Sequence, residues 1–183
     1  MPEEMLVRHC SPTLAGLKPG SLFSCECTAP EKLRDEICCM NHKLVPKGLR
    51  VLPMRWMNGR ALIYVYRPRD LASKLQNTAA AGILAKCGYP ETRVESCICR
   101  LRSRFQHGEE FPHEVGLFLG YPPEDVEGFI SQKARNYKCV GCWKVYGDAE
   151  AAQRTFEKYK RCTDAYCSQW EKGISIERLT VAC

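Results

Sequence analysis

The chain has 183 residues, 45% of them hydrophobic, and 27 basic against 21 acidic residues give a net charge of +6. This length suits one domain with a buried core. The positive charge permits an anionic partner, but it is not gathered into a long run that would demand nucleic acid. No apolar run could cross a membrane, and the first ten residues, with Glu3, Glu4 and Arg8, lack the apolar core of a signal peptide. The sequence therefore predicts a cytoplasmic protein without a membrane partner.

The first elements form a helix, a strand and a second helix. We expect a short helix over residues 3–10, ended by Pro12, and a strand over 21–25 after a loop. A longer helix is predicted over 30–43, with Thr28 as its N-cap. Its apolar stripe, spaced for one buried face, consists of Leu33, Ile37, Met40 and Leu44.

A β-hairpin is the strongest local signal in the chain. Apolar, aromatic and β-branched runs over 49–56 and 60–66 flank the dipeptide Asn58-Gly59. Asn-Gly favours the two-residue turn in which both residues have positive φ. We predict that the two runs pair antiparallel.

Two helices are expected after the hairpin. The first opens at Pro68 and continues to about Cys87, and the second covers residues 91–105. The second has an apolar face formed by Val94, Ile98, Leu101 and Phe105. Its other sides carry several arginines, which we interpret as a solvated basic face, with phosphate or nucleic-acid contact as the alternative.

The stretch 114–119 is too short for periodicity to separate a helix from a buried strand. Gly120 suits the end of either element. Pro122 and Pro123, followed by acidic residues, predict the start of another helix. If 114–119 is helical, the two segments have the outline of a helix-turn-helix unit.

The C-terminal part predicts a strand over 138–146 interrupted near Gly141, a long helix over 147–172 and a final strand over 174–181. Alternating strands and helices predict an α/β or α+β fold. We expect a single domain over 1–183, with a mixed sheet that includes the hairpin and helices packed on it. The competing interpretation is a mostly helical protein whose only sheet is the hairpin.

The chain contains 13 cysteines. Without a signal peptide we expect reduced thiols, and an odd number leaves one unpaired in any intramolecular disulfide scheme. Cys139 and Cys142 have the spacing of half a zinc or iron–sulfur site. Cys162 and Cys167 would diverge by about 140° on a helix, so they do not complete it. We predict no metal site, and the alternative is a structural metal held by Cys139, Cys142 and one distant residue.

Three separated motifs resemble the DUF3793 family, which occurs mainly in Firmicutes. They are residues 9–18 (His-Cys-Ser-Pro-Thr-Leu-Ala-Gly-Leu-Lys), 111–130, which begin Phe-Pro-His-Glu, and 141–146 (Gly-Cys-Trp-Lys-Val-Tyr). The resemblance covers nearly the whole chain and implies a bacterial, intracellular protein whose family has no assigned function. The family's genes accompany those of flavodoxins and iron uptake, which makes a flavodoxin a possible partner by association alone.

Our first functional hypothesis is a small-molecule site, enzymatic or only binding, where the three motifs meet. Its candidate catalytic residues are His9 and Cys10, as base and thiol, and His113 and Glu114, as an acid–base pair. Its candidate ligand-binding residues are Lys18, Lys144 and Tyr146. The sequence names no cofactor, and for His113 or Glu114 alone a structural role is equally consistent with the pattern.

Two alternatives remain open. One is a helix-turn-helix-like nucleic-acid-binding or regulatory module, although the second helix begins with acidic residues where it would approach phosphates. The other is an iron or haem protein with His9 or His113 and a cysteine as ligands, which only the gene association favours.

Overall fold

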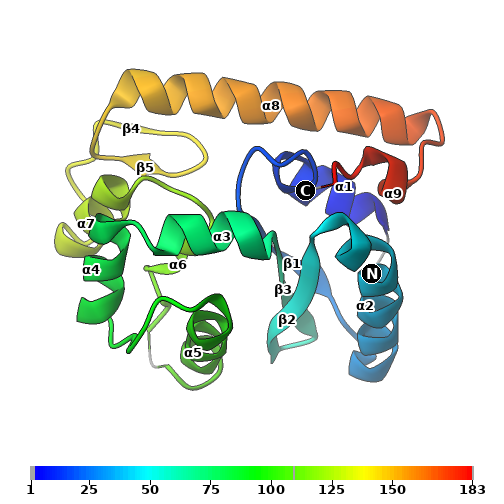
Figure 1. Cartoon of the computed structure of the whole chain (residues 1–183), viewed down its shortest axis with the longest axis horizontal. Helices are drawn as coiled ribbons and strands as arrows, with labels where there is room; N and C mark the ends of the chain where they lie inside the picture. The colour runs from blue at the N-terminus through cyan, green and yellow to red at the C-terminus, as the bar shows by residue number, and fades with distance from the viewer. Residues whose placement is uncertain (1–2, 109, 183) are drawn as a thin grey trace. The chain divides into compact units, whose positions relative to one another are not determined.

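The computed structural model describes residues 3–108 and 110–182. It is an α+β structure with two small antiparallel sheets, which confirms the predicted fold class (Figure 1). The chain divides into two compact units: unit 1 is Met1–Asp70 with Arg161–Cys183, and unit 2 is Leu71–Lys160. The single domain expected over 1–183 stays a prediction.

Unit 1 contains a three-stranded sheet in the order β1-β3-β2. Its strands are β1 (Gly20–Glu26), β2 (Arg50–Met57) and β3 (Arg60–Tyr66), and both pairings are antiparallel. Asn58 and Gly59 have φ values of 51° and 71°, as the two-residue turn requires. The predicted hairpin is confirmed.

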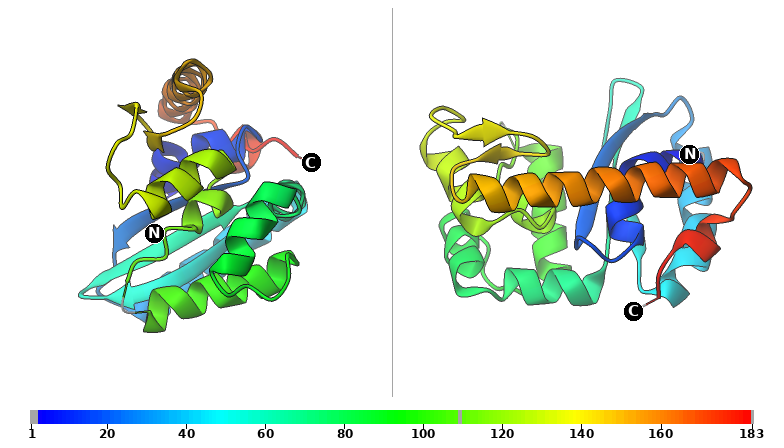
Figure 2. Two further views of the ribbon diagram at one scale, coloured as in Figure 1. Left: turned by 90° about the vertical axis from the view of Figure 1, so that its left-hand side faces the viewer. Right: turned by 90° about the horizontal axis from the view of Figure 1, so that it is seen from above.

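Helices α1 (Glu3–Leu14) and α2 (Pro30–Leu44) share one core with this sheet, together with the short helix α9 (Ile176–Leu179) (Figures 1 and 2). A 3-10 turn, η1 (Val45–Lys47), connects α2 to β2. The stripe predicted on α2 is buried in this core, whose sheet face is formed by Ala61, Ile63 and Val65 of β3. Alternation along β3 places these three side chains on the same side.

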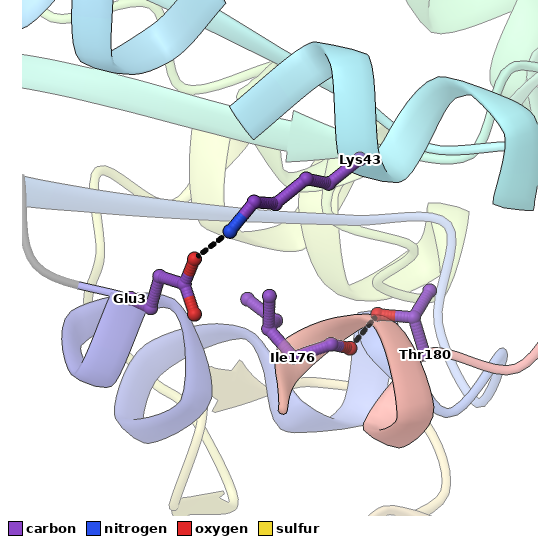
Figure 3. Close-up of polar contacts among 4 residues, drawn as sticks. All are labelled: Glu3, Lys43, Ile176 and Thr180. Atoms are coloured by element: carbon purple, nitrogen blue, oxygen red, sulfur yellow. Dashed lines mark hydrogen bonds and ion pairs between the residues drawn. The ribbon is translucent and has the colours of Figure 1, made fainter. Parts of the chain in front are cut away.

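Two polar contacts lie at the ends of these helices (Figure 3). Lys43 Nζ of α2 lies 2.6 Å from Glu3 Oε1 of α1. The Thr180 hydroxyl donates to the Ile176 carbonyl at 2.7 Å and closes the last turn of α9.

Three local predictions in unit 1 are wrong. Pro12 lies inside α1, two residues before its end, and does not break the helix although proline has no backbone N–H to donate. The N-cap of α2 is Ala29, without a side-chain hydrogen bond, so Thr28 is not the cap. The expected final strand is helix α9, since Ile176 and Leu179 are three residues apart and both buried.

Unit 2 is helical apart from one small hairpin. Two helices contain residues of both units: α3 (Pro68–Leu75) and α8 (Ala149–Glu171). Helix α8 is one continuous helix (Figure 2). The elements wholly within unit 2 are α4 (Thr78–Lys86), α5 (Val94–His107), α6 (Val115–Phe118), α7 (Pro123–Ser131), β4 (Cys139–Val140) and β5 (Lys144–Val145).

Local hydrogen bonds explain where unit 2 departs from prediction. The single helix expected from Pro68 to Cys87 is divided, because Asn77 Oδ1 accepts from the backbone N–H groups of Ala79 and Ala80 and starts α4. The ambiguous stretch 114–119 contains helix α6. The interrupted strand over 138–146 is instead the antiparallel hairpin β4–β5.

Candidate functional site

Helix α7 lies beside the β4–β5 hairpin (Figure 1). One buried carboxylate joins them. Asp125 lies in the first turn of α7 and is 3% exposed. Its Oδ2 accepts from Trp143 Nε1 at 2.6 Å, and its Oδ1 accepts from the backbone N–H groups of Tyr146 and Gly147 at 2.7 and 2.8 Å. A charged acceptor with three donors fixes the hairpin firmly against the helix.

Alternation along β5 gives the hairpin two different sides. Trp143 and Val145 are buried in a core with Ala152 of α8. On the other side, Lys144 Nζ lies 6.0 Å from the centre of the Phe129 ring of α7. Tyr146 also packs on α7, since a Cβ added to Gly128 would lie 2.5 Å from Tyr146 Cγ. Two predicted ligand-binding residues, Lys144 and Tyr146, therefore lie against the C-terminal half of α7.

His113 joins the same neighbourhood through ring contacts. Its ring centre lies 4.9 Å from that of Phe129 and 5.8 Å from that of Phe111. Lys144 Nζ lies 4.6 Å from the centre of the Tyr137 ring, within cation–π range. We call Phe111, His113, Phe129, Tyr137 and Lys144 the ring row. Phe111 is 50% and Tyr137 42% exposed, and His113 is exposed as well.

The loop after α7, residues 132–138, is strained beside the ring row. Lys133, Ala134 and Asn136 have φ values of 50°, 60° and 56°. The left-handed conformation costs a non-glycine residue about 1–2 kcal/mol, and such residues cluster at functional sites. Lys144 Nζ supports the loop by donating to the Ala134 carbonyl at 2.9 Å. Arg135 is exposed in the same loop.

The Tyr146 hydroxyl is buried without a hydrogen-bond partner in the described part of the chain. Burial raises its pKa, and Tyr137 and Asp125 contribute to the rise. Buried hydroxyl groups without a partner are uncommon and costly. This hydroxyl is therefore an unused donor next to the ring row.

Glu114 is held inside unit 2. It is 1% exposed, and its Oε1 accepts from the Tyr89 hydroxyl at 2.9 Å. Arg104 Nε lies 2.6 Å from the same oxygen, although its N–H does not point at it, so this contact is an ion pair. Tyr89 and Arg104 hold the Glu114 carboxylate inside the protein, whereas the neighbouring His113 is exposed. The predicted acid–base role of Glu114 stays a prediction.

The remaining predicted residues belong to unit 1. The exposed His9 stacks on Phe23, with ring centres 5.2 Å apart. Cys10 is fully buried, and burial raises its pKa to about 12, against smaller lowering effects from Lys18 and a Ser21 hydrogen bond. Successive helical residues point about 100° apart, so His9 does not follow Cys10 into the core. A base beside a thiol would lower the thiol pKa, and the raised pKa of Cys10 shows that His9 does not do so here. The catalytic roles of His9 and Cys10 and the binding role of Lys18 stay predictions.

The family model described as "Protein of unknown function (DUF3793)" matches residues 6–180. The chain belongs to the DUF3793 family. This confirms the predicted family membership. No curated protein and no solved structure match the chain.

Three residues of this neighbourhood of the DUF3793 protein carry no role in the hypotheses drawn from the sequence. They are Phe129, Tyr137 and Asp125. One available signal was the segment 133–138, in which Tyr137 is surrounded by Lys133, Arg135 and Lys138. Aromatic residues among basic ones are typical of surfaces that bind aromatic anions.

In residues 3–108 and 110–182 of the DUF3793 chain, no three His, Cys, Asp or Glu side chains come together as a metal site. No helix there is long and apolar enough to span a bilayer. Cys139 and Cys142 lie in the β4–β5 hairpin, and neither forms a disulfide bond with a described residue.

Proposed function

We propose that this DUF3793 protein binds a flat, anionic small molecule at the ring row of unit 2. One observation carries the proposal: His113 and Lys144, from two separate sequence motifs, both contact the Phe129 ring. The row exposes flat rings on which a planar ligand could stack. Tyr146 adds a buried hydroxyl without a protein partner in the described residues.

The charge of the neighbouring loop favours an anion. Lys133 and Arg135 are exposed, and neither side chain forms a hydrogen bond or ion pair with another described residue. Lys144 adds a third positive charge beside the rings. A planar aromatic group with a phosphate or carboxylate, as in a nucleotide, would use both the rings and the cations.

The helix-turn-helix alternative has weaker support. Helix α6 is only four residues long, and Asp125 near the start of α7 is buried and occupied by three donors. The exposed Glu124 and Glu127 would face phosphates with negative charge. We therefore favour a small ligand over duplex nucleic acid.

Isothermal titration calorimetry with adenosine 5′-monophosphate tests the proposal. We expect saturable binding that weakens by about tenfold or more in His113→Ala and in Tyr137→Ala, because a stacked ring contributes about 1–3 kcal/mol. Arg135→Ala should weaken binding and reduce its salt dependence. Lys158→Ala, an exposed cation on α8, is the matched control and should leave affinity unchanged.

Two outcomes would contradict this function. Either the wild-type protein does not bind the nucleotide, or the ring-row variants bind it as tightly as the control does. Thermal melts of each variant would confirm that the fold is intact. Preference for a single-stranded oligonucleotide over the mononucleotide would assign the same surface to nucleic acid instead.

A further inference from the structure

Unit 1 contains a pocket of about 270 Å³ beside the start of β2. Segments from two parts of the chain form it, namely η1 with the start of β2, and the end of β3 with the start of α3. The lining residues are Val45, Pro46, Gly48, Leu49, Arg50, Arg67, Pro68 and Arg69. None of them is acidic.

The backbone at two places, Gly48 and Arg67, positions the residues that line the pocket. Gly48 has a φ of 82°, a conformation that glycine adopts without strain, and it turns the chain from η1 into β2. On the opposite segment, the Arg67 N–H donates to the Pro19 carbonyl at 2.8 Å. These contacts place Arg50 and Arg69 beside one pocket although they are 19 positions apart in the sequence (69 − 50).

Among the described residues, the side chains of the two outer arginines have no partner. Arg50 and Arg69 are exposed, and neither guanidinium forms a hydrogen bond or ion pair with any described residue. Arg67 is different, because its buried guanidinium donates to the carbonyl oxygens of Thr13, Leu14 and Val181. Two guanidinium groups beside one pocket repel each other, and a bound anion would turn this repulsion into attraction.

The rest of the wall is apolar. Val45, Pro46, Leu49 and Pro68 provide hydrocarbon surface next to the charges. An inorganic ion would use only the arginines, whereas an organic anion would also cover this surface. The pocket volume is near the lower end of the range for small-molecule sites, so the ligand must be small.

We infer that this pocket binds a small organic phosphate, with Arg50 and Arg69 holding the phosphate oxygens and the apolar wall covering the organic part. Guanidinium groups present paired N–H donors that match phosphate oxygens. The site is separate from the ring row of unit 2 and does not depend on the function proposed there.

Titration with phenyl phosphate at low ionic strength tests this inference. We expect saturable binding that is tighter than binding of inorganic phosphate, and no binding of phenol. Arg50→Ala and Arg69→Ala should each weaken it about tenfold, as loss of a charged hydrogen-bonded contact does. Arg102→Ala removes an exposed arginine of α5 and should change nothing.

Two results would overturn the inference. One is the absence of saturable phenyl phosphate binding, and the other is binding by the Arg50→Ala and Arg69→Ala variants that is as tight as binding by Arg102→Ala. Weakening by His113→Ala, with no effect of Arg50→Ala, would assign the anion to the ring row. Both arginines are exposed, so circular dichroism melts should show folded variants.

Discussion

The Trp143 indole N–H donates to Asp125 Oδ2 at 2.6 Å, and this bond connects residues that are 18 positions apart. Both side chains are buried, with exposed fractions of 8% for Trp143 and 3% for Asp125. The carboxylate also binds the backbone of the residues that follow β5. The same contact therefore sets the position of Lys144 and Tyr146 relative to α7.

Asp125→Ala should lower the free energy of unfolding by about 2–4 kcal/mol, since three buried donors lose a charged acceptor. Urea unfolding followed by circular dichroism measures the change. Asp164→Ala, an exposed carboxylate of α8, is the control and should shift stability by less than about 0.5 kcal/mol. Equal effects of the two substitutions would show that the Asp125 contacts do not stabilise the fold.

Glu114→Gln should lower the free energy of unfolding by about 1–2 kcal/mol, because Arg104 loses the charge of its buried partner. The Arg104 side chain is 34% exposed, so water compensates for part of the loss. Tyr89→Phe removes the other partner, and a double-mutant cycle measures the coupling between them. If Glu114→Gln has an unchanged melting temperature but no longer binds adenosine 5′-monophosphate, the result would favour the acid–base role of Glu114 over the structural one.

Gly59→Ala should destabilise the protein by about 1 kcal/mol, because the turn holds residue 59 at positive φ. An added Cβ there would meet no atom within 4 Å, so the cost is conformational and not steric. Gly82→Ala, in helix α4 with equally open space, should instead stabilise by about 0.5–1 kcal/mol. Thermal melts that move in the same direction would refute this assignment.

Cys10 should react slowly with iodoacetamide in the native protein, because burial raises its pKa to about 12. The exposed Cys38 and Cys39 should be modified first. The raised pKa also gives a pH dependence: the contribution of this group to stability is complete below its ordinary value of 9.0 and is lost as pH rises toward 12. Mass-spectrometric mapping at pH 8 measures the order of labelling, and early modification of Cys10 would restore it as a nucleophile.

Local patterns predicted several elements because their causes lie within a few residues. Asn58-Gly59 determines its own turn, and the spacing of Leu33, Ile37 and Met40 determines which face of α2 is apolar. The same kind of evidence failed where a short segment permits two structures. Residues 174–181 alternate well enough for a strand, yet Ile176 and Leu179 are buried as neighbours on a helix.

The sequence by itself determined the family, a fold class of α/β or α+β, the hairpin and the apolar faces of the main helices. Only the tertiary structure decided which distant segment packs against each helix face. Asp125 was expected to be one of the acidic residues that start a helix, but its partners are in a hairpin 18 to 22 positions away. His113, Phe129 and Lys144 meet for the same reason, since periodicity identifies a buried or exposed side without identifying the distant segment that packs there.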